Sequence, residues 1–258
     1  MFSTYHFLWL VICFSLEVGL LIALHKYRPS LRNVLSWACF GCVVSEVVKT
    51  LSVLEMVPSA DGSTMHLYLE MGHLPLHLCS IQILFIFYSR FGENEKIKET
   101  LLAFMYPTCT VGALLATMIP TTLSSDPTVM EAFARPLTYQ YFLFHAMLIV
   151  LGIYISMSSQ VKIKPRHYVS TMGILGVLGF FSLYLNSAFA APTYVNGEMI
   201  SVDYSTNFFF TQKAPIEIPL IEKWHWILYL AVIVTIAMVV VGGFYLPYVI
   251  KAKKEKGA

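Results

Sequence analysis

The sequence predicts an all-α membrane protein with seven transmembrane helices, its N-terminus outside the cell and its C-terminus cytoplasmic. The first observation is composition: of 258 residues, 57% are hydrophobic and only 12% are charged, and the mean hydropathy is +0.68. These values lie far from those of a soluble domain. The second observation is that the basic residues alternate between the connections that join the apolar stretches.

Seven apolar stretches have the length that a membrane span requires. A hydrocarbon core about 30 Å thick needs about 20 apolar residues per helix. The predicted spans are residues 4–25, 34–56, 74–91, 100–120, 139–159, 168–190 and 225–249. They occupy most of the chain, so we expect a single domain covering residues 1–258. The first stretch lacks a positive n-region and a small-residue cleavage site, so we expect it to be retained as a span.

The distribution of lysine and arginine predicts the orientation. The connections after the first, third, fifth and seventh spans carry Lys26, Arg28, Arg32, Arg90, Lys96, Lys98, Lys162, Lys164, Arg166, Lys251, Lys253, Lys254 and Lys256. The other connections hold mostly acidic residues. Because basic connections stay on the cytoplasmic side, the N-terminus is predicted to lie outside.

The longest predicted connection is an irregular exterior loop over residues 191–224, and a loop of this length is often a lid or a binding element. All five cysteines fall within predicted spans, so a disulfide framework is not indicated. No basic patch with interleaved aromatic residues suggests nucleic acid. No glycine-rich phosphate-binding motif is present, and we expect no cofactor.

Polar side chains within the spans indicate where function lies, because an ionisable group in hydrocarbon is costly. Glu46 has Lys49 three residues further on, and the two can neutralise each other on one helical face. The polar residues predicted to lie at similar depths in the outer half of the bundle are Glu46, His77, Cys79, Gln82, His145, Tyr184 and Asn186. Such a layer, drawn from separate helices, is expected of a site that faces the outer leaflet.

Helix geometry limits how these groups combine. His77 and Cys79 are two residues apart and point about 200° away from each other, so they do not form a nucleophile–base pair. If Cys79 is the nucleophile, His145 of another span is the candidate base. Asn186 or Gln82 is then a candidate donor to the developing oxyanion. A Ser80–His77 pair is a competing arrangement.

Two other classes of function remain open. His73 and His77 are four residues apart on one predicted helical face, and Glu70 or His145 completes a candidate metal site for an intramembrane hydrolase. The second class is a non-enzymatic transporter or lipid-binding protein whose polar layer lines a pathway. No internal repeat relates the two halves of the chain, which argues against transport.

Several segments together resemble a known family. They are His73–Ser80 (HLPLHLCS), Glu46, the helix with His145, Asn207–Phe210 (NFFF) and Trp224–Tyr229 (WHWILY). In these segments the chain resembles the bacterial YwaF family of seven-helix membrane proteins. That family is similar to the eukaryotic transmembrane protein 164 family of acyltransferases and, more distantly, to the androgen-induced-gene family of fatty-ester hydrolases.

The resemblance implies that the chain moves a fatty acyl group between glycerophospholipids of the cytoplasmic membrane through a cysteine–histidine pair. His145 matches the family's histidine, and Asn186 and Asn207 match polar positions of the bacterial family. The expected partners are a membrane phospholipid or other acyl lipid and the bilayer itself. In the resulting hypothesis Cys79 attacks an acyl ester, His145 takes and returns the proton, and Glu46 or His77 orients the site.

Overall fold

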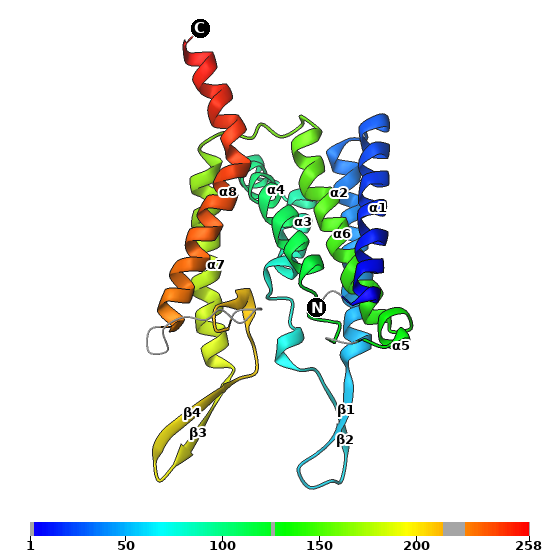
Figure 1. Cartoon of the computed structure of the whole chain (residues 1–258), viewed down its shortest axis with the longest axis vertical. Coiled ribbons are helices and arrows are strands. Elements are labelled where there is room, and N and C mark those ends of the chain that lie inside the picture. The colour runs from blue at the N-terminus through cyan, green and yellow to red at the C-terminus, as the bar shows by residue number, and fades with distance from the viewer. Residues whose placement is uncertain (1–2, 125–126, 214–224, 258) are drawn as a thin grey trace. The chain divides into compact units, whose positions relative to one another are not determined.

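The computed structural model describes residues 3–124, 127–213 and 225–257. Helices dominate it, and two β-hairpins extend from their ends (Figure 1). The chain divides into two compact units, which are described separately below. Unit 1 comprises residues 1–73 and 79–162, and unit 2 comprises residues 74–78 and 163–258.

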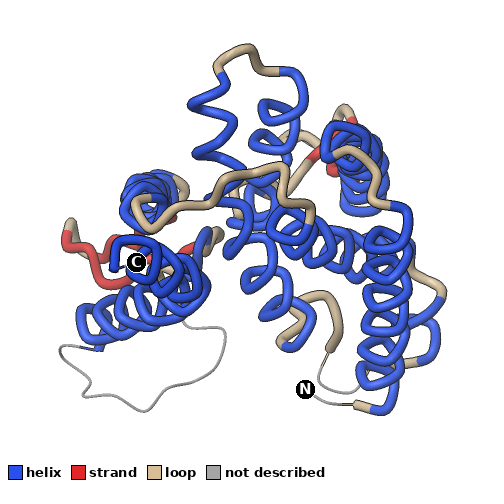
Figure 2. The backbone as a smooth tube through the Cα atoms, turned by 90° about the horizontal axis from the view of Figure 1, so that it is seen from above, coloured by secondary structure: helices blue, strands red, loops and turns tan. Residues whose placement is uncertain are grey.

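Unit 1 is built mainly from long helices, which Figure 2 shows as blue tubes. Its elements are α1 (Thr4–Tyr27), α2 (Leu31–Val53), β1 (Glu55–Pro58), β2 (Met65–Tyr68), the 3₁₀ turn η1 (Met71–His73), α3 (Leu78–Phe91), α4 (Glu95–Met118), α5 (Val129–Phe133) and α6 (Pro136–Met157). Side-chain caps fix several starts: Ser30 accepts a hydrogen bond from the Asn33 amide, and Asn94 accepts from two amides of α4. These caps begin α2 and α4 earlier than the hydrophobic pattern predicts.

Helix α6 forms the centre of unit 1, where it packs against α1, α2 and α4. Trp9 of α1 stacks on Phe142 of α6 with ring centroids 4.9 Å apart. The indole of Trp9 donates to the Ala132 carbonyl at 2.9 Å. On another face of α6, Gly152 allows α4 to come close: a Cβ atom there would lie 2.4 Å from Thr110 Oγ1 and 2.9 Å from the Thr110 amide nitrogen.

Replacing Gly152 with alanine is therefore expected to destabilise the protein. Part of the clash is with backbone, so α4 and α6 must move apart, at a cost of about 1–3 kcal/mol in the free energy of unfolding. Unfolding in mixed detergent micelles measures this loss. The matched control is Gly173→Ala in α7, where nothing lies within 4 Å of the new Cβ; equal stability of the two variants would contradict the close approach.

The cytoplasmic connections predicted from charge gather at one end of unit 1. The hydroxyl of Tyr154 near the end of α6 donates to the Pro29 carbonyl at 2.5 Å. The amide of Leu31 donates to the Gln160 side chain at 2.8 Å. Arg90 of α3 donates to Ser36 of α2 at 2.6 Å. The basic segments that follow α1, α3 and α6 thus share one end, and the membrane side that this end faces stays a prediction.

Among the described residues, six helices are long and apolar enough to cross a membrane: α1, α2, α4, α6, α7 and α8. The seventh predicted span, 74–91, is helical only from Leu78, and α3 has 14 residues. At about 1.5 Å per residue it is about 21 Å long, shorter than the bilayer core. The prediction of helix over residues 74–77 is wrong: these residues form turns and bends, and α3 begins at Leu78. Pro75 disfavours helical geometry in Leu74, the residue before it. The count of seven spans stays a prediction.

Unit 2 contains a helix pair and a hairpin. Its elements are α7 (His167–Ala188), β3 (Ala190–Val195), β4 (Glu198–Tyr204), the 3₁₀ turn η2 (Phe208–Phe210) and α8 (His225–Gly257). The hydroxyls of Thr171 in α7 and Tyr245 in α8 are hydrogen-bonded at 2.8 Å in the helix interface. This contact is buried and joins the two helices.

The irregular loop predicted over 191–224 is partly wrong, because residues 190–204 form the antiparallel hairpin β3–β4. Asn196 and Gly197 connect the strands with φ values of 52° and 82°. Two consecutive positive φ angles define the tight turn that Asn-Gly favours in hairpins. Residues 214–224 of the predicted loop lie outside the described part of the chain.

The other hairpin, β1–β2, has a turn organised by Asp61. Its carboxylate accepts hydrogen bonds from the hydroxyls of Ser59 and Ser63, at 2.5 and 2.8 Å, and from the Ser63 amide at 3.1 Å. The Ser59 hydroxyl first, and then the Ser63 groups, lower the pKa of Asp61 from 3.8 to about 2. The turn is therefore stabilised above pH 3.8, and this stabilisation is lost as the pH falls through about 2.

Carboxyl carbon NMR in detergent is expected to show Asp61 titrating well below an ordinary aspartate. In Ser59→Ala the pKa of Asp61 should rise toward 3.8, since the largest contribution is removed. A pKa of Asp61 that is the same in both proteins would show that the turn hydroxyls do not hold the carboxylate.

Candidate functional site

Cys79 is the second residue of α3 and is half-buried. Gln82 lies three residues further on, so the two side chains share one helical face. Gln82 is fully buried, and its Nε2 donates to the Thr108 hydroxyl of α4 at 3.0 Å. Thr108 in turn donates to the Phe104 carbonyl at 2.7 Å. Gln82 Oε1 has no hydrogen-bond partner. The face of α3 that carries the thiol therefore also carries a buried amide fixed by α4.

His145 lies in α6 with 7% of its surface exposed. Its Nδ1 is 2.6 Å from the carbonyl oxygen of Tyr141, one turn earlier. A carbonyl only accepts hydrogen bonds, so Nδ1 carries the hydrogen. In the neutral ring Nε2 is then the nitrogen with the lone pair, which is the form that a general base requires.

Tyr141 holds the candidate base, His145, within unit 1. Its ring centroid lies 4.4 Å from that of His145. The Tyr141 hydroxyl donates to the Ala116 carbonyl of α4 at 2.8 Å, which fixes the ring. Tyr141 thus contacts the ring of His145 and is itself fixed by α4.

Tyr141 was not among the site residues predicted from the sequence. The available signal was its spacing, because residues four apart on a helix lie on one face. A tyrosine one turn before a candidate catalytic histidine is positioned to contact it. Many aromatic residues in the spans have such spacings, so the signal was weak.

Glu46 forms the predicted ion pair with Lys49 in α2. The ammonium lies 2.7 Å from Oε2 and 2.8 Å from Oε1. Both side chains are largely buried. The preceding residue, Ser45, accepts a hydrogen bond from Gln140 of α6 at 2.7 Å. Glu46 is therefore a neutralised group beside the α2–α6 contact.

The other predicted site residues belong to unit 2. The ring of His77 packs against Phe208 with centroids 5.1 Å apart. Tyr184 is 69% exposed on α7. Asn207 accepts hydrogen bonds from the backbone amides of Gln212 and Lys213 and donates to the Lys213 carbonyl at 2.8 Å. Asn207 therefore closes the loop that follows β4.

Asn186 is fully buried at the end of α7 and makes four hydrogen bonds to that loop. Its Nδ2 donates to the Phe208 carbonyl at 3.1 Å and to the Thr211 hydroxyl at 2.9 Å. Its Oδ1 accepts from the Thr206 hydroxyl at 3.0 Å and from the Phe208 amide at 2.9 Å. Both amide hydrogens are committed, so Asn186 holds the loop and has no hydrogen left for an oxyanion.

Asn186→Ala is expected to destabilise unit 2 by about 3 kcal/mol, because several buried loop groups lose their partner. The loop also holds Phe209 and Phe210 at positive φ, 57° and 53°, a strained geometry that needs support. Limited proteolysis and detergent unfolding both report this change. Tyr184→Phe on the same helix is the control, and a loss as large in that variant would argue against the network.

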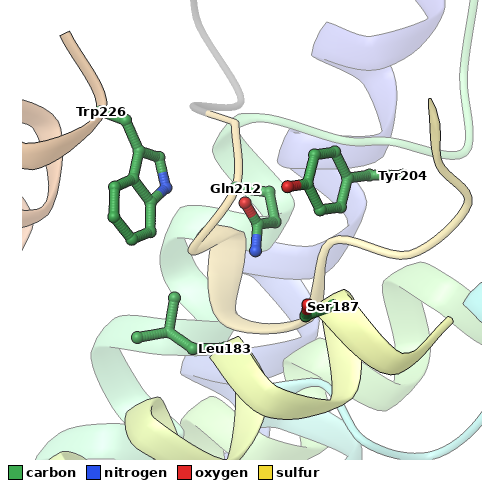
Figure 3. Close-up of a pocket in the computed structure, with 5 residues that line it drawn as sticks. All are labelled: Leu183, Ser187, Tyr204, Gln212 and Trp226. Atoms are coloured by element: carbon green, nitrogen blue, oxygen red, sulfur yellow. The ribbon is translucent and has the colours of Figure 1, made fainter. Parts of the chain in front are cut away.

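A small pocket of about 270 Å³ lies beside the same loop (Figure 3). Its lining residues are Leu183, Ser187, Tyr204, Gln212 and Trp226. The hydroxyl of Tyr204 points toward the side chain of Gln212 (Figure 3). Trp226 is fixed by donating its indole hydrogen to the Thr211 carbonyl at 2.9 Å. The lining is uncharged, with hydrogen-bonding groups on one side and apolar side chains on the other.

The candidate metal site required His73 and His77 to lie on one helix, and in the structure they do not. His73 is the last residue of η1, and His77 lies in the turn before α3, so the two do not share the predicted helical face. The helix α3 begins only at Leu78. His73 Nε2 lies 3.8 Å from Glu70 Oε2. Within the described residues, no group of three or more His, Cys, Asp or Glu side chains is placed to hold a metal ion.

Comparison with known proteins identifies the family. The model of the TMEM164 family matches residues 1–245. The chain belongs to the TMEM164 family. Neither the curated proteins nor the solved structures contain a match. The expected relation to the transmembrane protein 164 family is confirmed, while the resemblance to the bacterial YwaF family stays an expectation. In this TMEM164-family member the match includes every candidate site residue named above.

Proposed function

We propose that this TMEM164-family membrane protein is an acyltransferase that acts on acyl esters of glycerophospholipids in the cytoplasmic membrane, near the outer leaflet. The observation that carries the proposal is the buried imidazole of His145, whose Nδ1 lies 2.6 Å from the Tyr141 carbonyl, in the same unit as the half-buried thiol of Cys79. A thiol and an imidazole of defined tautomer, held by separate helices of one unit, are the groups that a covalent acyl-transfer mechanism needs. The YwaF resemblance supports the same activity.

The reaction proceeds in two half-reactions. Cys79 Sγ attacks the ester carbonyl carbon of the donor lipid while the thiol proton passes to His145 Nε2. The ester C–O bond then breaks, and the leaving alkoxide takes the proton from the imidazolium. A thioester on Cys79 and a lysolipid result. An acceptor alcohol next gives its proton to His145 and attacks the thioester, the C–S bond breaks, and the proton returns to Cys79.

The neighbouring groups have distinct roles in this proposal. The Tyr141 carbonyl holds His145 in the tautomer that leaves Nε2 basic. The amide of Gln82 lies on the Cys79 face, and its hydrogen not donated to Thr108 is the proposed oxyanion donor. The Glu46–Lys49 pair contributes a local dipole and no proton transfer. We assign no step to His77, Tyr184, Asn186 or Asn207.

The test is acyl transfer by the purified protein in phospholipid vesicles. The donor is a phosphatidylcholine with an isotope-labelled acyl chain, and the acceptor is a lysophosphatidylethanolamine. Mass spectrometry of the extracted lipids is expected to find the labelled chain on the acceptor, with and without a chelator. Labelled free fatty acid alone would identify a hydrolase, and sensitivity to the chelator would favour the metal-dependent alternative. No turnover of either kind would favour a lipid-binding or transport role.

A further inference from the structure

Helix α1 carries a buried carboxyl group that the proposed reaction does not use. Glu17 lies near the middle of α1 and is only 5% exposed. It follows Thr4 by 13 residues, so it lies about 20 Å along the helix at about 1.5 Å per residue. Because α1 is a candidate membrane span, this position corresponds to the middle of the bilayer. An ionisable group at this depth is costly, which makes Glu17 a candidate functional group.

The surroundings of Glu17 are apolar. The buried face of α1 consists of His6, Trp9, Leu10, Cys13 and Glu17. This helix packs against α6, where the Cys13 thiol approaches the Phe142 carbonyl at 3.8 Å and Cys13 joins a cluster with Ala146. Glu17 lies one turn further along the same face, and Cys13 interacts with it electrostatically. A thiol cannot neutralise a carboxylate.

The carboxyl group also lacks the partners that an anion needs. Its Oε1 is buried and makes no hydrogen bond. The ion pairs found in the described part of the chain join Lys49 to Glu46, His73 to Glu70 and Lys98 to Glu95, and none includes Glu17. Glu46 in α2, also a candidate membrane span, differs because its carboxylate is held directly by Lys49.

An unpaired carboxylate in an apolar interior is so unfavourable that the group takes up a proton instead. An ion pair with good geometry offsets the cost of burying the charge. We propose that Glu17 is a proton-binding site at the middle of the membrane, with its carboxyl group in the neutral, protonated form at neutral pH, whereas Glu46 is held in an ion pair with Lys49. This inference is independent of the proposed acyl transfer.

Infrared difference spectroscopy of the protein in vesicles at neutral pH tests the proposal. The spectrum of wild type minus Glu17→Gln is expected to contain the C=O stretch of a protonated carboxylic acid. Wild type minus Glu46→Gln should instead contain the two stretches of a carboxylate. Loss of carboxylate bands in Glu17→Gln would overturn the proposal, because Glu17 would then be ionised.

Reaction with dicyclohexylcarbodiimide supplies a second measurement that needs no change at Glu17. This apolar reagent takes the proton of a carboxylic acid on one nitrogen and the carboxylate oxygen on its central carbon, then rearranges to a stable N-acylurea. Peptide mass spectrometry of the wild type is expected to place the added reagent on Glu17 and not on Glu46. Modification of Glu46 with Glu17 unmodified would overturn the proposal.

The Lys49→Met variant extends this measurement by removing the cation from Glu46. Glu46 is then also an unpaired intramembrane carboxyl and should become reactive toward the carbodiimide. Reaction of Glu46 in this variant while Glu17 stays unmodified would contradict the protonated state of Glu17, since the reagent would have been shown to enter the protein.

Discussion

Replacement of Cys79 with alanine is expected to lower acyl transfer by about a thousandfold or more, because loss of the nucleophile leaves only binding and electrostatic stabilisation. The half-buried thiol is a small part of the α3 surface, so the variant should retain its fold. Transfer of the labelled chain in vesicles measures the effect. Detergent unfolding of the same sample shows whether the protein is intact.

Cys39→Ala is the matched control for the loss of a thiol. Cys39 is buried in α2, also within unit 1, and it has no role in the proposed chemistry. Its replacement should leave the turnover within a fewfold of wild type. If Cys79→Ala and Cys39→Ala had the same activity, Cys79 would not be the nucleophile.

His145→Gln is expected to lower turnover by about a hundredfold to ten-thousandfold, the usual contribution of a positioned general base. Glutamine keeps an amide hydrogen that can donate to the Tyr141 carbonyl, so the local packing of α6 is largely preserved. The loss should fall on the maximal rate in both half-reactions. Following the amount of acyl-enzyme over time in a single turnover measures the two half-reactions separately.

The control for His145 is His66→Gln in strand β2. His66 is exposed and bonds to the Thr64 hydroxyl at 3.0 Å, remote from the proposed chemistry. The His66→Gln variant should leave the rate of acyl transfer unchanged. A His145→Gln protein that formed the thioester at the wild-type rate would exclude the histidine as the base.

Hydrophobic length predicted the helices well, since a long apolar stretch is a strong and local signal. It failed at residues 74–77, which form turns and bends before α3, and at the starts of α2 and α4, where Ser30 and Asn94 act as caps. The β3–β4 hairpin carried a readable signal, the Asn196-Gly197 pair, which the expectation of an irregular loop overlooked.

The candidate site was harder to predict because its geometry depends on contacts between helices. The sequence suggested Cys79 and His145 from depth alone, whereas the hydrogen bond that fixes Tyr141 beside His145 depends on how α4 and α6 pack. Asn186 looked equally suited to catalysis, but its four hydrogen bonds go to the loop after β4. Glu17 was overlooked because its burial depends on the α1–α6 interface.

The central claim is that Cys79 carries the acyl group between two lipids, and intact-protein mass spectrometry tests it most directly. Wild type, Cys79→Ala and His145→Gln are incubated with mixed phospholipids, and each sample is measured before and after hydroxylamine. The account predicts a hydroxylamine-sensitive acyl adduct on wild type, none on Cys79→Ala, and slow accumulation on His145→Gln. Lipid turnover by wild type with no adduct, or the same adduct on Cys79→Ala, would contradict it.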